Sequence, residues 1–170
     1  MKPVARLIAD RRGAAAVEMA LALPLLLVLI FGAFDGGNYF LAEHVVQKAT
    51  RDAARYAARL PMTNYPSCTI PSGGAAEQQT QRVARSGDPG GAPGQRLAGW
   101  TADNMTTVTI NCAVVGSFNN AGIYKDFPSS GAAPVITVSA SVPYKPLFGY
   151  VFRGLTLNAS ADSQAAVIGA

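Results

Sequence analysis

The strongest pattern in the chain is an apolar run from Ala14 to Phe34, in which Glu18 is the one charged residue. At 1.5 Å of rise per residue, a helix over this run is about 31 Å long, enough to cross the hydrocarbon core of a bilayer. A cleavable secretory signal also has a basic start and an apolar centre, but this run is longer and leads into a further helical pattern. The pattern therefore predicts one membrane-spanning helix.

A second pattern, with apolar residues three and four positions apart, follows a short polar patch at 35–38. This period is typical of an amphipathic helix, so the spanning helix is expected to continue as a stalk, giving one helix over 14–60. Pro61 supplies a stop, because the residue before a proline is disfavoured in a helix. The predicted apolar stripe of the stalk consists of Leu41, Val45, Ala49, Ala53, Tyr56 and Leu60.

Between Pro61 and Trp100, proline, glycine, serine and glutamine dominate, which predicts loop with one short helix around Ala76 to Ser86. After this region the period changes to two, as expected of strands with one buried face. The three predicted apolar faces are Val108, Ile110, Cys112 and Val114, then Ile136, Val138, Ala140, Val142 and Tyr144, then Leu155, Leu157, Ala159 and Ala161. The aromatic connection 143–152 packs under the sheet, lies at the membrane surface or contacts a partner, and the sequence leaves these open.

Three short strands form a small antiparallel sheet whose apolar face needs a cover, and the stalk helix is the best available one. The expected fold class is therefore α+β, with a long N-terminal helix packed on a small antiparallel sheet. The loop-rich β domain is expected to extend over residues 61–170.

The charges ahead of the apolar run predict its orientation. Lys2, Arg6, Arg11 and Arg12 precede the span against one acid, Asp10. By the positive-inside rule the N-terminus lies in the cytoplasm, and residues beyond about 35 lie outside.

The remaining charges argue for no particular ligand. The formal net charge is +4, but the basic residues are scattered, with clusters only at the start of the chain and along the stalk. Nucleic acid is therefore not an expected partner. Arg51, Arg55 and Arg59 form a basic row, which fits a solvated face of the stalk or a contact with an acidic partner.

The two cysteines, Cys68 and Cys112, both fall in the outer part of the chain, where an oxidising compartment would let them pair. Closing a loop of that length stabilises the fold by about 4 kcal/mol in the chain-entropy model. Two unpaired, buried thiols are the alternative.

No catalytic constellation can be assembled from these residues. His44 is the single histidine, and no carboxylate stands at a spacing that would orient it. One histidine, two cysteines and scattered acids do not make a metal site, and neither a nucleotide fingerprint nor a nucleophile elbow is present. We therefore expect no catalytic, metal or cofactor site, and an anchored hydrolase is disfavoured because a nucleophile and base pair is missing.

Glu18 is the one residue of the span that calls for an explanation. A carboxylate at the centre of a spanning helix costs about 2.5 to 3.5 kcal/mol on insertion scales. If the chain were cut after Gly13, Ala14 would carry an ammonium group four residues before Glu18, on the same helical face. The alternative is that Glu18, one turn inside the run, snorkels to the cytoplasmic interface.

Residues 11–21, Arg-Arg-Gly-Ala-Ala-Ala-Val-Glu-Met-Ala-Leu, with Pro24 soon after, resemble the N-terminus of the TadE-like family. These proteins are minor pilins or pseudopilins of the tight-adherence, or Flp-type, pilus. The likeness continues through the alanine- and arginine-rich segment 47–58, whereas the outer domain matches only loosely. One departure is Met19, where these subunits often have phenylalanine.

The resemblance implies a pilin-like fold and a cytoplasmic leader over residues 1–13, removed by a prepilin peptidase between Gly13 and Ala14. It implies that Glu18, then the fifth residue, pairs with a neighbouring subunit's N-terminal amine, and that the helix can bend at Pro24. The implied partners are this peptidase, other major and minor pilin subunits, the pilus assembly platform and inner-membrane lipid.

The sequence therefore predicts a minor pilin of a bacterial inner membrane that acts in pilus assembly and surface adhesion, with no enzymatic activity. It has one span, a cytoplasmic N-terminus and a periplasmic C-terminal domain, and it is incorporated into an extracellular pilus. An unprocessed, membrane-anchored scaffold or adhesive module of a secretion complex is the alternative.

Overall fold

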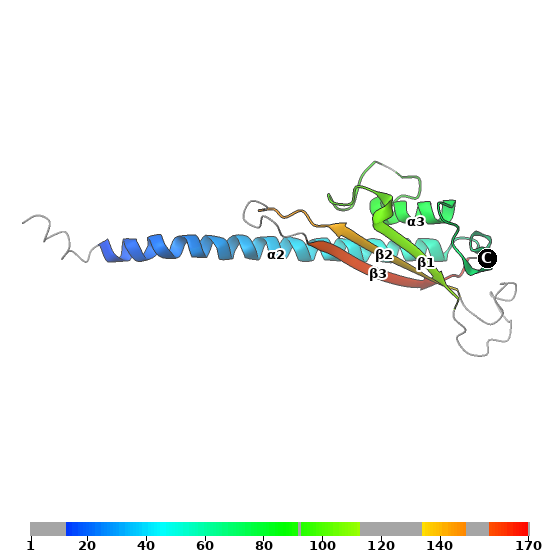
Figure 1. Ribbon diagram of the computed structural model, residues 1–170, viewed down its shortest axis with the longest axis horizontal. Helices are drawn as coiled ribbons and strands as arrows, with labels where there is room; N and C mark the ends of the chain where they lie inside the picture. The colour runs from blue at the N-terminus through cyan, green and yellow to red at the C-terminus, as the bar shows by residue number, and fades with distance from the viewer. Residues whose placement is uncertain (1–12, 92, 113–133, 149–156, 170) are drawn as a thin grey trace, which may run out of the picture. The chain divides into compact units, whose positions relative to one another are not determined.

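The computed structural model describes residues 13–91, 93–112, 134–148 and 157–169, and Figure 1 shows its elements. The chain divides into two compact units, Met1–Asn38 and Tyr39–Ala170, and helix α2 (Ala14–Ala58) contributes to both. The described part of the first unit is the apolar half of α2, and the second unit holds the sheet.

Helix α2 comprises 45 residues and passes through the polar patch at 35–38 without interruption. It ends at Ala58, two residues before the predicted end and three before Pro61. One continuous helix therefore carries both the apolar run and the stalk, as the two consecutive patterns predict.

The sheet of the second unit has three strands, β1 (Thr106–Asn111), β2 (Val135–Pro143) and β3 (Asn158–Ala166). Their order is β1-β2-β3 and both pairings are antiparallel, so β1 and β3 form the edges (Figure 1). The predicted α+β fold, a long helix packed on a small antiparallel sheet, is confirmed. Val114 and Leu155, which the predicted strands included, lie outside the described residues.

The strand register joins the alternating apolar residues into one inner face. Val138 of β2 lies opposite Val108 of β1 and Ser163 of β3, and Ile136 lies opposite Ile110 and Ala165. Fully or nearly fully buried residues of this face are Val108, Ile136, Val138, Ala140, Val142 and Ala159. The inner face of β3 carries only small side chains, which leaves room for a helix to approach closely.

The face of α2 that packs in the second unit differs from the predicted stripe at its first two positions. Leu41 is 65 % exposed and Val45 is half-buried, whereas Ala42 and Val46 are buried. The buried residues of α2 are Ala42, Val46, Ala49, Thr50, Ala53, Ala54, Ala57 and Ala58. The prediction of an alanine-rich packing face is thus confirmed, but its first two positions are wrong.

Helix α3 (Ala75–Ser86) forms where the loop-rich region was expected to hold one short helix. It ends at Gly87, whose φ of 88° is a left-handed conformation that glycine adopts without steric cost, and whose N–H bonds to the carbonyl of Val83 at 2.9 Å. Gln81 donates a hydrogen bond of 3.1 Å from Nε2 to the main-chain oxygen of Thr106. Helix α3 therefore satisfies a group on the outer edge of β1.

Both ends of the stalk are fastened to β3 and the residues after it. At one end the hydroxyl of Tyr39 donates to the carbonyl of Asn158 at 3.2 Å. At the other end the carbonyl of Ala58 accepts a hydrogen bond of 2.8 Å from the N–H of Ile168. Within the second unit, the stalk part of α2 therefore runs in the same direction as β3.

Candidate functional site

The candidate assembly segment lies at the start of α2. Gly13 directly precedes the helix, Ala14 is its first residue, and both are exposed. A Cβ atom built on Gly13 meets nothing within 4 Å. Packing within the described residues therefore does not require glycine at this position.

Glu18 lies one helical turn after Ala14 and is exposed. Residues four apart on an α-helix lie on the same face, with about 5 to 6 Å between their Cβ atoms. A carboxylate at Glu18 therefore stands within reach of an ammonium at residue 14. Because its side chain is exposed, it is equally open to an amine supplied by a neighbouring helix.

Pro24 lies inside α2 and does not end it. Proline has no N–H, so the carbonyl of Ala20, four residues earlier, lacks its usual intrahelical donor. The helix is weakened at this turn, where bending costs less than elsewhere in the apolar run.

The apolar half of α2 is long enough and apolar enough to cross a membrane, and none of its most apolar 18-residue window is buried inside the structure. Its large apolar side chains from Val17 to Phe34, apart from the half-buried Phe31, are 41 to 74 % exposed. A core helix of a soluble protein would bury such a face. The segment fits a single-pass membrane anchor.

The stalk presents its basic row to solvent. Arg51, Arg55 and Arg59 are exposed and project away from the buried alanines. The nearby acid Asp52 is turned toward the loop, where its Oδ2 lies 2.7 Å from Nη1 of Arg96. The row is thus a solvated face within this chain.

A polar contact that sequence reasoning missed joins α2 to the edge strand β3. Oε1 of Glu43 accepts a hydrogen bond of 2.7 Å from the hydroxyl of Tyr39 and one of 3.2 Å from the N–H of Ser160. The i, i+4 spacing of Tyr39 and Glu43 is visible in the sequence, but their partner is 117 residues away from Glu43. This carboxylate satisfies an edge N–H that would otherwise be open to pairing.

The outer face of the sheet carries hydroxyl side chains around a shallow hollow of about 330 Å³. Its lining includes Met105, Thr107, Ser139, Ser141, Ser160 and Asp162. Asp162 is the one ionisable group in this lining, so the hollow offers hydrogen bonds but no nucleophile and base pair. His44 lies exposed on α2, and within the described ranges no cluster of metal-ligating side chains occurs.

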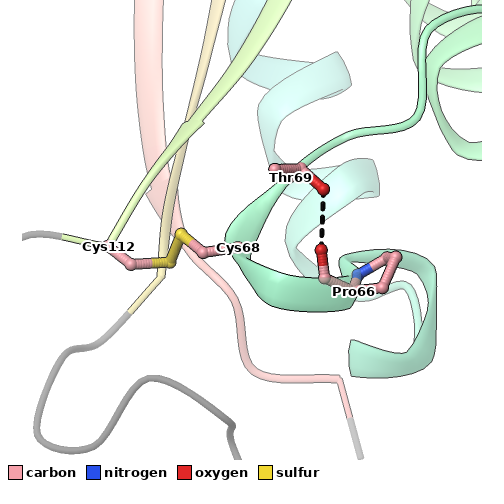
Figure 2. The surroundings of a disulfide bond; sticks show 4 residues. All are labelled: Pro66, Cys68, Thr69 and Cys112. Atoms are coloured by element: carbon pink, nitrogen blue, oxygen red, sulfur yellow. Dashed lines mark hydrogen bonds between the residues drawn. A yellow bond between two sulfur atoms is a disulfide. The ribbon is translucent and has the colours of Figure 1, made fainter.

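A disulfide bond joins Cys68 to Cys112, whose Cα atoms are 6.1 Å apart (Figure 2). It connects the short 3-10 turn Pro66–Cys68 to the residue that follows β1. Ser67 and Cys68 have positive φ angles of 52° and 58°. Left-handed conformations cost about 1 to 2 kcal/mol for residues other than glycine, so this turn needs support from its surroundings.

That support comes from two sides. The hydroxyl of Thr69 donates a hydrogen bond of 2.7 Å to the carbonyl of Pro66, closing the turn (Figure 2). The covalent bond to Cys112 then fixes the turn to the end of the strand. The disulfide is therefore a structural tie of the second unit, away from the segment around Gly13 and Glu18 in sequence.

Together these features define a class of protein, one with an apolar N-terminal helix that fits a single-pass anchor and a disulfide-tied α+β unit. Residues 13–55 match the family model of TadE-like proteins, so the resemblance is confirmed and the chain is TadE-like over this segment. The match associates this segment with pilin-like proteins of the tight-adherence pilus. Neither the curated proteins nor the solved structures include a match to the chain.

Proposed function

We propose that the chain is a minor pilin of a tight-adherence pilus, matured by a prepilin peptidase and acting in pilus assembly and surface adhesion. The observation that carries this proposal is where the TadE-like segment begins. It starts at Gly13, the residue before the proposed cut, and it includes the apolar run with Glu18. Everything upstream of the match corresponds to the proposed leader.

In this proposal the basic residues Arg11 and Arg12 hold the leader on the cytoplasmic side, where the peptidase cuts between Gly13 and Ala14. The cut creates an ammonium group at the positive end of the helix dipole, where a cation is unfavourable. Glu18 offsets this charge when the mature helix lies beside another subunit. The pairing also removes the cost of a lone carboxylate in the hydrocarbon region.

The roles proposed for the rest of the chain follow from a cytoplasmic N-terminus. The apolar half of α2 packs laterally against other subunits in the inner membrane or the pilus, with Pro24 allowing a local bend. The second unit lies in the periplasm or outside the cell, where the disulfide between Cys68 and Cys112 forms under oxidising conditions. Its hydroxyl-rich outer sheet face and its basic row are the surfaces that can bind other subunits, the assembly platform or the surface to which the pilus adheres.

The deciding experiment is intact mass spectrometry of the full chain, extracted from membranes after co-expression with the cognate prepilin peptidase. We expect the mass of a chain that begins at Ala14. A catalytically inactive peptidase should leave the full-length species, and so should Gly13→Val, since a larger side chain obstructs the cut, and a Cβ at this position meets nothing within 4 Å among the described residues.

The matched control is Gly37→Val, at another glycine whose Cβ would meet nothing within 4 Å. It should be processed like the parent. Persistence of the full-length parent under active peptidase would contradict maturation and favour the unprocessed, membrane-anchored scaffold or adhesive module of a secretion complex.

A further inference from the structure

The outer edge of β1 is only partly satisfied within the chain. In an antiparallel ladder, the N–H and carbonyl of one residue point to the same side, and the side alternates along the strand. The carbonyl of Thr106 accepts a hydrogen bond from Gln81 of α3, so Thr106 faces away from β2, and Val108 and Ile110 do the same. Among the described residues, no hydrogen bond reaches the outward groups of Val108 and Ile110. These groups are therefore open to another strand.

The outer edge of β3 is capped at one end and open at the other. Side chains of α2 bond to the carbonyl of Asn158 and to the N–H of Ser160, so these two residues face away from β2. The same alternation turns the main-chain groups of Asp162, Gln164 and Ala166 outward. No described residue bonds to these groups, so the second half of this edge is also open.

The open parts of the two edges lie at the same level of the sheet. Through β2, Thr106 lies in one row with Ala161, and Asn111 lies in one row with Ala166. The capped start of β3 therefore lies beyond the row of Thr106, where β1 does not reach. The stalk caps β3 only along the part that the β1 strand of a sideways neighbour would leave unpaired.

We propose that β1 of a second copy of this chain adds to β3, in parallel and with its Thr109 opposite Gln164, so that one sheet runs through both copies. The strands β1 and β3 run in the same direction, because each is antiparallel to β2. A copy displaced sideways therefore keeps its stalk pointing the same way, whereas antiparallel pairing of β1 with β1 would reverse one stalk. Chains anchored by the same helix in one membrane need the first arrangement, and this choice of orientation rests on the anchoring within the proposed function.

This register gives every open group of β1 a partner on β3. In a parallel ladder, a residue bonds to the two residues that flank the one opposite to it. The N–H of Gln164 thus donates to the carbonyl of Val108 in the second copy, and the carbonyl of Gln164 accepts from the N–H of Ile110 there. The two remaining open groups of that β1 bond to the carbonyl of Asp162 and the N–H of Ala166.

The side chains fit the same register. On the outer face, Thr107 of the second copy lies beside Asp162, where its hydroxyl can donate to the carboxylate. On the inner face, the half-buried Ile110 of the second copy lies beside the half-buried Ala165. Charged residues and prolines often protect an edge strand from such pairing, and β1 contains neither.

The test is a cross-link between two differently tagged versions of the full chain in one membrane, one with Thr109→Cys and one with Gln164→Cys. Both positions are exposed on the outer face. Opposite residues of neighbouring strands lie about 5 Å apart, within the range of a disulfide. Mild oxidation should therefore join the two versions, and mass spectrometry of unreduced peptides should locate the bond between positions 109 and 164.

A chain that carries both changes should form a ladder of oligomers rather than a dimer. The proposed interface uses a different edge on each copy, so it does not close and continues from one copy to the next. A product that stops at the dimer would contradict this arrangement.

Two matched controls keep the outer face and change one feature each. Thr137→Cys stands in the same row as Gln164 but on the central strand, and it should not cross-link to Gln164→Cys of another copy. Ser160→Cys lies at the capped end of β3 and should not cross-link to Thr109→Cys. Cross-linking of these pairs as strong as that of the test pair would reflect random collision and would overturn the proposal.

The direction and the hydrogen bonds of the pairing have their own readouts. A disulfide between two copies of Thr109→Cys alone would indicate antiparallel pairing of β1 with β1, and the proposal would be wrong. Adding Ile110→Pro to the Thr109→Cys chain removes one outward N–H, which an edge strand tolerates, so the cross-link to Gln164→Cys should be lost while the emission of buried Trp100 is kept. A cross-link that persists would contradict the proposed hydrogen bonds.

Failure of this proposal is distinguishable from failure of the proposed function. If the prepilin peptidase shortens the chain but positions 109 and 164 never cross-link, the strand pairing is wrong and maturation stands. If the two positions cross-link in a chain that the peptidase leaves at full length, the pairing stands and maturation is wrong.

Discussion

The hydroxyl of Tyr65 donates a hydrogen bond of 2.6 Å to the main-chain carbonyl of Ala57, in the last turn of α2. Tyr65 is 1 % exposed, and burial raises the pKa of its hydroxyl well above the ordinary value of 10.0. The side chain thus fastens the first turn after Pro61 to the end of the stalk.

Tyr65→Phe should lower the free energy of unfolding by about 1 to 2 kcal/mol at pH 7, because the hydrogen bond to a buried helix-end carbonyl is lost. The matched control is Tyr56→Phe, whose hydroxyl donates to the side chain of Gln79 at 2.9 Å. This change should lower the free energy of unfolding by less, since the part-buried side chain of Gln79 can form a hydrogen bond with water instead. Denaturant unfolding in detergent measures the stability of both variants. Equal losses of stability would contradict the greater importance of the Tyr65 hydrogen bond.

The same tyrosine predicts a loss of stability at alkaline pH. A group whose pKa is higher in the folded state than in the unfolded state stabilises the fold fully below its unfolded pKa, and that contribution declines as the pH rises above it. The stability of the parent should therefore fall as the pH rises above about 10, the ordinary tyrosine value. The difference in the free energy of unfolding between the parent and Tyr65→Phe should become smaller over the same pH range. A difference that grew there would refute this account.

How far the sequence predicts this fold depends on how local each signal is. The apolar run, the stalk and the alternation from Ile136 to Val142 are local patterns, and each predicted its element. The packing face of α2 is not fixed locally, because most of its buried residues are alanines, which mark a packing face only weakly in the sequence. The larger Leu41 and Val45 suggested one stripe, whereas the structure buries Ala42 and Val46 instead.

The candidate site residues also differ in whether a local sequence signal reveals them. Glu18 stands out in the sequence because a charge in an apolar run is costly wherever the helix lies. The pairing of Glu43 with Ser160 and the contacts of Tyr39 with Tyr144 and Asn158 require the tertiary arrangement of segments more than one hundred residues apart. The two cysteines suggested a disulfide, but the sequence left two unpaired thiols as an alternative. Sequence spacing alone does not show whether two thiols come close enough to bond.

Glu18→Ala should block pilus assembly without blocking membrane insertion. Removing the carboxylate lowers the cost of inserting the helix by about 2.5 to 3.5 kcal/mol if the group lies at bilayer depth. Membrane fractionation should therefore find the variant anchored, while electron microscopy finds no pili. Glu43→Ala, on the same helix but in the second unit, is the control and should retain pili. Normal pili from Glu18→Ala would mean that this carboxylate only snorkels to the interface.

Removing the disulfide with the double change Cys68→Ser and Cys112→Ser should lower the free energy of unfolding by about 4 kcal/mol by loop entropy. The strained turn at Ser67 and Cys68 would also lose its covalent support. Adding a reductant should bring the parent down to the stability of the variant and leave the variant unchanged. A parent insensitive to full reduction would contradict a stabilising role.

Gly99→Ala should be strongly destabilising, by about 1 to 3 kcal/mol or more, as overpacking in a core is. Gly99 is buried, and a Cβ built on it collides with the carbonyl oxygen of Pro143, the last residue of β2. Gly37→Ala, where a Cβ meets nothing within 4 Å, is the control. It should stabilise α2 by up to about 1 kcal/mol through helix propensity. Thermal unfolding of both variants tests the contrast, and a neutral Gly99→Ala would show that the loop can move away.

Ala53→Leu tests the close approach of the stalk to the sheet. Ala53 is fully buried, so a larger side chain there must push α2 away from the elements that cover it or adopt a strained rotamer, at a cost of about 1 to 3 kcal/mol. The matched control is Gln47→Leu, on an exposed face of the same helix, which should change stability by less than about 0.5 kcal/mol. Urea unfolding followed by the fluorescence of buried Trp100 measures both. If the two variants proved equally stable, the helix would not be held against the sheet by its small side chains, and the displacement of the packing face from Leu41 to Ala42 would need another cause.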